Sequence, residues 1–283
     1  MSSTAEAKMS ALVTRIAEVC PMPATAQRVL ALAADPSSEI RNVAEAISAD
    51  PALAAECLRI ANSAVFRRGR PVDTLGQAVL TLGLAQIHEM ASAMALMAAF
   101  QTEDELSLQL HTTSVVSGSL AGLAASSVGV SPGVAFLAGL LAEVGAMACV
   151  AIDSDRFGKI HAAAGTSWSA RAALESERYG GPSWEIGSRL LKRNELPEHL
   201  CLAVGASISD ENILSAAPLT RVTVFGRVAA GAIVRLGDDD ELATLGPELF
   251  DIAKNLGMPF EDEEDVVDLA ERAIASAESK LRA

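Results

Sequence analysis

Residues 47–66 read ISADPALAAECLRIANSAVF, and this stretch decides the fold class. Asp50 and Pro51 supply an N-cap and a proline at the first helical position. The apolar residues that follow fall mostly on one face of a helix: Leu53, Cys57, Leu58, Ile60, Ala61 and Val65. Asn62 and Ser63 interrupt this face, and an amide there can bond a neighbouring loop and fix the helix against it. The stretch therefore predicts a core helix with two polar residues, Asn62 and Ser63, near its end.

Helix signals continue on both sides of this stretch. Thr74 and Gln77 have the spacing of a capping box, in which each side chain satisfies a free N–H group of the other. Ser131-Pro132 repeats the cap-plus-proline pattern, and Pro197 and Pro218 each stand where a new helix can begin. The best strand candidate, residues 220–225, lies within a longer helical apolar pattern. The whole chain is therefore predicted to be all-α.

Composition narrows the classes of partner. The chain has 283 residues, a net charge of −14 and 50% hydrophobic residues, enough for one large or two modest domains with real cores. Nucleic acids and anionic membrane surfaces are bound through lysine and arginine. The charge therefore argues against nucleic acid as a partner.

Location and redox state follow from the same composition. The four cysteines form no CxxC pair, so they indicate buried, reduced thiols rather than a zinc or redox motif. The first 20 residues lack the basic start and apolar core of a signal peptide, and we expect a cytoplasmic protein. Residues 106–142 carry no charged side chain, but Ser131-Pro132 divides them and they are rich in Ala, Gly and Ser. They predict two buried helices and no membrane span.

Three stretches resemble the HDOD family, a bacterial signalling relative of the HD and HD-GYP phosphohydrolases. They are CPMPATAQRVLAL (20–32), ISADPALAAECLRIANSAVF (47–66) and RPVDTLGQAVLTLGLAQI (70–87), and they match in order and spacing. The resemblance implies a two-lobed, all-α HDOD domain with a degenerate HD lobe. We place the N-terminal helical lobe at residues 1–100 and the HD-like lobe, with C-terminal helices, at 101–283, because the polar run 101–105 separates them.

The resemblance also implies where HD enzymes keep their metal ligands. AFLAGLLAEVGAMA (135–148) resembles the helix that carries the His-Asp doublet, and Ala142 and Glu143 fill the doublet positions. His111 falls at the first family histidine, Trp184 stands at a later one, and Gly226 at a later aspartate. Imidazoles and carboxylates must converge to hold a metal that activates water. With so few ligands left, we expect no metal, no other cofactor and no catalysis.

Some residues could instead carry binding. Arg67, Arg68 and Arg70 form the one basic cluster, in a Gly/Pro stretch that could grip a phosphate or an acidic segment. If Trp168 and Tyr179 are exposed, they would mark an anchor site for a partner. If they are buried, they are part of the core packing. Asn62 could contact a partner or ligand directly. The alternative is the structural role described above, in which its amide bonds a neighbouring loop.

The sequence is thus interpreted as a bacterial pseudoenzyme: a cytoplasmic regulatory module of a signalling pathway, acting through a protein partner. One alternative is a sensor that binds a nucleotide or other small ligand in the vestigial HD cleft. A remote alternative is a metal-dependent phosphohydrolase. The partner and the pathway are not specified by the sequence, and a homodimer stays open.

Overall fold

The computed structural model describes residues 3–21, 24–34, 39–62, 65–66, 71–100, 102–165, 167–236 and 242–281. Every regular element in these ranges is a helix, and no strand occurs among them. The predicted all-α class is therefore confirmed. Residues 220–225, the best strand candidate, lie inside a helix.

Five helices form the N-terminal helix group: α2 (Ala24–Ala34), α3 (Ile40–Ser48), α4 (Pro51–Ala61), α5 (Leu75–Leu82) and α6 (Leu84–Phe100). The predicted starts of α4 and α5 are confirmed. The Asp50 carboxylate accepts the Leu53 N–H at 3.1 Å, and the Thr74 hydroxyl accepts the Gln77 N–H at 3.2 Å. The Gln77 side chain accepts the N–H of Asp73, one residue before the position that a capping box requires.

The C-terminal helix group is larger. Its α-helices are α7 (Glu105–Ala124), α8 (Pro132–Leu140), α9 (Val144–Ala164), α10 (Trp168–Tyr179), α11 (Ser183–Arg193), α12 (Glu198–Gly205), α13 (Pro218–Ile233), α14 (Gly246–Asn255) and α15 (Glu263–Leu281). Helix α7 lies at its centre and packs against α8, α9, α13 and α15. Small residues permit the close crossings: a Cβ on Gly139 of α8 would lie 2.7 Å from the Ser117 carbonyl oxygen of α7. The apolar, charge-free stretch 106–142 thus forms packed core helices, as predicted.

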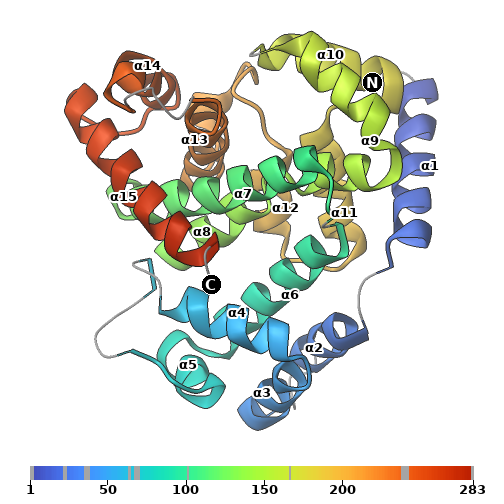
Figure 1. The fold of residues 1–283 in the computed structure, drawn as a ribbon, viewed down its shortest axis with the longest axis vertical. Coiled ribbons are helices and arrows are strands. Elements are labelled where there is room, and N and C mark those ends of the chain that lie inside the picture. Colours follow the sequence, from blue (N-terminus) through green and yellow to red (C-terminus); the bar gives the residue numbers. More distant parts are fainter. Residues whose placement is uncertain are drawn as a thin grey trace.

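Helix α1 (Ser3–Val19) packs on the C-terminal helix group, against α9, α10 and α11, although its residues precede the N-terminal helix group in sequence (Figure 1). Arg189 of α11 donates both guanidinium arms to the Glu6 carboxylate. A Cβ on Gly181 would lie 1.9 Å from the Met9 methyl carbon, so α1 also approaches the α10–α11 turn closely. The chain therefore crosses from one helix group to the other between α1 and α2.

One stretch of the described residues, Pro132–Ala164, is long and apolar enough by composition to cross a membrane. In its most apolar window, 89% of the residues are buried inside the fold. This burial is what a core helix of the packed bundle requires.

Candidate functional site

The two residues at the doublet positions lie in the turn that joins α8 to α9. Ala142 and Glu143 are 2% and 3% exposed. The turn packs on the start of α11, because a Cβ on Gly145 would lie 1.9 Å from the Ser183 carbonyl oxygen. Only glycine allows this approach. It brings Glu143 beside Arg171 of α10 and the start of α11.

A buried arginine occupies the space beside Glu143. Arg171 of α10 donates to the Glu143 carboxylate at 3.0 Å, to the Glu175 carboxylate at 2.8 Å and to the Ser183 hydroxyl at 3.1 Å. The second carboxylate oxygen of Glu175 accepts the backbone N–H of Ser183. Burial alone would lower the pKa of Arg171, but Glu143 and Glu175 outweigh it and raise the pKa above its ordinary value. These groups satisfy one another and form a closed ionic network.

A second buried arginine completes the cluster. Arg227 of α13 is 1% exposed and donates to the backbone carbonyls of Val204 and Ala206. Its guanidinium carbon lies 5.2 Å from the ring centroid of Trp184, at cation–π distance. Burial lowers the pKa of Arg227 to about 10. We call the whole cluster the guanidinium centre, and its members are Glu143, Trp168, Arg171, Glu175, Ser183, Trp184 and Arg227.

The guanidinium centre leaves little free space. A cavity of about 40 Å³ borders Glu143, Arg171, Trp168 and His161. Such a volume suits a few water molecules, whereas small-molecule sites usually measure about 300–1,000 Å³. Across the described ranges, no group of three or more His, Cys, Asp or Glu side chains is arranged to hold a metal ion. The one acidic residue kept at the doublet, Glu143, is already bound to Arg171.

Trp184 is buried, at 6% exposure, and its ring lies 6.1 Å from that of Trp168. Trp168 is half-buried between the two arginines, 5.3 Å from the guanidinium carbon of Arg171 and 5.7 Å from that of Arg227. Tyr179 is 6% exposed and packs near Phe157. Of the two readings given to Trp168 and Tyr179, the structure therefore favours packing over an exposed anchor.

His111 and Gly226, the other two positions matched to metal ligands of the family, are not members of the guanidinium centre. His111 is on α7, where burial and then the charge of Arg59 on α4 lower its pKa. It is not among the residues that line the cavity beside Glu143; Leu110 and Thr113 are. Gly226 packs on α7, since a Cβ there would lie 2.6 Å from the Ser117 carbonyl oxygen. The next residue of α13, Arg227, is the one whose side chain belongs to the guanidinium centre.

Asn62 fixes a loop rather than facing solvent. Its amide nitrogen donates to the carbonyl oxygens of Leu58 at 2.9 Å and Val72 at 2.8 Å, and its amide oxygen accepts the Val72 N–H at 2.7 Å. Of the two roles left open for Asn62, these bonds support the structural one. They join the end of α4 to Val72, two positions after the last arginine of the basic cluster. Arg67, Arg68 and Arg70 themselves lie outside the described residues.

Sequence reasoning missed four residues of the guanidinium centre: Arg171, Glu175, Ser183 and Arg227. A partial signal was present, because Arg171 and Glu175 have the i,i+4 spacing of a helical ion pair. On a helix surface such a pair is common and uninformative. Nothing in the sequence distinguishes this buried pair from an exposed one.

The comparisons with known proteins agree with the fold. The HDOD domain family matches residues 19–208. A crystal structure from Shewanella amazonensis SB2B, named as a candidate phosphohydrolase, has a TM-score of 0.70 at 23% identity, covering 96% of this chain and 98% of that one.

Two further solved structures share the fold. An HDOD domain protein of unknown function from Geobacter sulfurreducens has a TM-score of 0.58 at 23% identity, covering 92% of this chain and 90% of that one. A candidate signal transduction protein from Marinobacter aquaeolei VT8 has a TM-score of 0.63 at 19% identity, covering 99% of this chain and 65% of that one. No curated protein matches the sequence. Because the family match spans well over half of its residues, the chain belongs to the HDOD family.

Proposed function

We propose that this protein is a non-catalytic HDOD module of bacterial signal transduction, which acts in the cytoplasm by binding a protein partner. The family membership and a structural neighbour named as a candidate signal transduction protein support the pathway class. The partner class is favoured by the net charge of −14, which opposes nucleic acid.

The observation that carries the proposal is the Arg171–Glu143 pair. In HD enzymes the corresponding carboxylate belongs to the doublet that holds a metal. Here the Arg171 guanidinium is bonded to it at 3.0 Å, and Arg227 brings a second buried positive charge to the same cluster. A divalent cation would have to displace one arginine and lie near the other in a region of low dielectric, which is strongly unfavourable.

The cavity volume separates this proposal from a nucleotide sensor in the same cleft. The cleft beside Glu143 offers about 40 Å³. A nucleotide needs several times that volume. The packing of Trp168 and Trp184 over the two guanidinium groups fills the remaining space.

The absence of catalysis can be tested by metal analysis and a hydrolysis assay. We expect protein dialysed after incubation with excess Mn²⁺ or Mg²⁺ to retain no stoichiometric metal, and to leave cyclic di-GMP and bis(p-nitrophenyl) phosphate uncleaved. A metal-to-protein ratio near one that Glu143→Ala abolishes would contradict the proposal. The control Glu271→Ala changes an exposed carboxylate of α15 and should alter nothing.

Partner binding is tested by capture from the native host followed by mass spectrometry. The basic cluster is the predicted contact, so replacing Arg67, Arg68 and Arg70 by Glu should reduce recovery of the partner and leave the melting temperature unchanged. Recovery by the wild type should fall as salt rises. A matched control with the same charge change replaces three exposed arginines of the helices: Arg41, Arg156 and Arg272. Equal recovery by the two triple variants would remove the contact from the basic cluster.

A further inference from the structure

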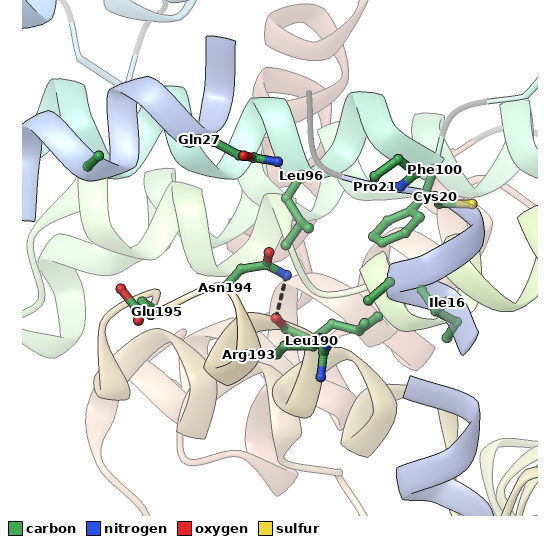
Figure 2. Close-up of a pocket in the computed structure, with 12 residues that line it drawn as sticks. Ile16, Cys20, Pro21, Gln27, Leu96, Phe100, Leu190, Arg193, Asn194 and Glu195 are labelled. Atoms are coloured by element: carbon green, nitrogen blue, oxygen red, sulfur yellow. Dashed lines mark hydrogen bonds between the residues drawn. The ribbon is translucent and has the colours of Figure 1, made fainter. Parts of the chain in front are cut away.

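A second cavity, far larger than the one beside Glu143, lies where α1, α2, α6 and α11 meet. Its volume is about 370 Å³, within the range of small-molecule sites. Figure 2 shows its lining. Ile16, Leu96, Phe100 and Leu190 are each at most 2% exposed and form an apolar floor. We call it the junction pocket, because α2 and α6 belong to the N-terminal helix group, whereas α1 and α11 pack in the C-terminal one.

Three helices end at the junction pocket. Helix α1 ends at Val19 beside Cys20, α6 ends at Phe100, and α11 ends at Arg193. The C-terminal end of each helix carries a partial negative charge from its last carbonyl groups. Pro21, on the pocket wall, has no amide hydrogen and cannot bond the Ala17 carbonyl four residues earlier. The Ala17 carbonyl at the end of α1 is therefore an acceptor that its own helix does not use, whereas the last carbonyls of α11 are bonded by Asn194, Glu195 and Leu196.

The charged side chains at the pocket do not reverse this polarity. One arginine, Arg193, and one glutamate, Glu195, stand on the lining, and both are exposed to solvent (Figure 2). Their formal charges cancel. The helix termini and the net charge of −14 on the chain then favour a positively charged ligand.

We infer that the junction pocket is a binding site for a small organic cation with a flat apolar body. The body rests on Leu96, Phe100 and Leu190, and the ammonium group donates to the Ala17 carbonyl at the end of α1. Such a ligand touches both helix groups at once. The site is independent of the proposed adaptor role, which requires no ligand and is tested by a different measurement.

Isothermal titration calorimetry with a matched pair of probes tests this assignment. Tryptamine and indole-3-propionate share the ring and the two-carbon spacer and differ in the sign of the end charge. We expect one tryptamine per chain, with a dissociation constant at least about fivefold lower than that of indole-3-propionate, since each helix terminus favours the cation by a few tenths to one kcal/mol. The preference should weaken as salt rises.

Two substitutions locate the binding. Ala17→Trp fills the pocket from α1 and should weaken tryptamine binding at least about tenfold, whereas Ala11→Trp, on an exposed part of the same helix, should bind like the wild type. If Ala17→Trp does not fold, as judged by circular dichroism, Ala31→Trp fills the pocket from the exposed side of α2. Three results would overturn the inference: no heat of tryptamine binding at millimolar concentration, equal affinity for the two probes, or wild-type affinity in a folded pocket-filling variant.

Cys20 gives a local readout of the same site. It lines the junction pocket and is partly exposed, whereas Cys57, Cys149 and Cys201 are buried. Burial raises the pKa of the Cys20 thiol, so alkylation by iodoacetamide should be slow but selective for it. Saturating tryptamine should slow the alkylation of Cys20, measured by mass spectrometry, and indole-3-propionate at the same concentration should not. An unchanged rate with tryptamine would place any binding elsewhere.

Discussion

The guanidinium centre and the junction pocket differ in what surrounds their charges. In the guanidinium centre the charged groups of Glu143, Arg171 and Glu175 are buried and bonded to one another, and about 40 Å³ remains free. At the junction pocket Arg193 and Glu195 are exposed, the buried floor is apolar, and the volume is about 370 Å³. Side chains fill the first region, while the second stays open.

For the non-catalytic module proposed above, this difference indicates how the fold can be held together without a metal. A metal site holds several helices together through shared ligands. Arg171 performs the same joining here, since it links the α8–α9 turn, its own helix α10 and the start of α11 at Ser183. The proposed absence of a metal is thus compatible with a stable core. Space for a ligand is then found at the junction of the helix groups instead.

The largest expected effect comes from removing the charge at the guanidinium centre. Arg171→Met should lower the free energy of unfolding by about 3–5 kcal/mol, because it leaves the buried carboxylates of Glu143 and Glu175 without their partner. Denaturant unfolding measures the change. The triple variant that also carries Glu143→Gln and Glu175→Gln should recover at least about half of the loss, since the uncompensated charges are gone. A loss below about 1 kcal/mol in the single variant would mean that the network does not hold the helices together.

A smaller effect is expected where the guanidinium centre is most tightly packed. A Cβ on Gly145 would lie 1.9 Å from the Ser183 carbonyl oxygen and 2.5 Å from the Gly187 nitrogen, both backbone atoms that cannot rotate away. Gly145→Ala should therefore cost about 3 kcal/mol, the upper part of the range for overpacking. The control is Gly158→Ala in the part of α9 beyond its kink at Asp153, whose Cβ would meet only Leu106 at 3.9 Å. It should stabilise the protein by about 0.5–1 kcal/mol. Equal effects of the two substitutions in thermal melts would show that the α9–α11 crossing can relax.

The fold was largely predictable because its signals are local. The caps at Asp50 and Thr74 and the proline starts at Pro132 and Pro218 are confirmed in the structure. A cap needs only residues within one turn of each other, so the sequence contains the whole interaction. The packing of α1 on α9, α10 and α11 depends instead on contacts such as Glu6 with Arg189, which are 183 positions apart, and no local pattern reports it.

The sequence predicted which metal ligands of the family are missing from the candidate site. It did not predict which residues occupy their place. The family motif indicated that Ala142 and Trp184 cannot serve as metal ligands. It gave no position for Arg171 or Arg227, since a buried arginine differs from a surface one only in tertiary contacts. The junction pocket had no functional signal: Cys20, Pro21 and Gln27 lie in the stretch 20–32 that resembles the family, but the resemblance assigned them no ligand, and the rest of the lining comes from distant parts of the chain.

The smallest expected effect tests the rim of the junction pocket. Glu195 follows the end of α11 with a φ of 58°, the only non-glycine residue with positive φ in the described ranges. It is the left-handed residue of a Schellman motif: its N–H bonds the Lys192 carbonyl, and the Leu196 N–H bonds the Leu191 carbonyl.

Glycine is favoured at position 195, so Glu195→Gly should raise the free energy of unfolding by about 0.5–1 kcal/mol. The relieved strain exceeds the added freedom of glycine in the unfolded chain. Glu195→Ala removes the same carboxylate but keeps the strain, and its stability should stay within about 0.5 kcal/mol of the wild type. Equal stabilisation by the two variants in denaturant unfolding would assign the effect to charge. The larger gain with glycine would show that backbone strain is kept at the open pocket, beside the termini of α1, α6 and α11.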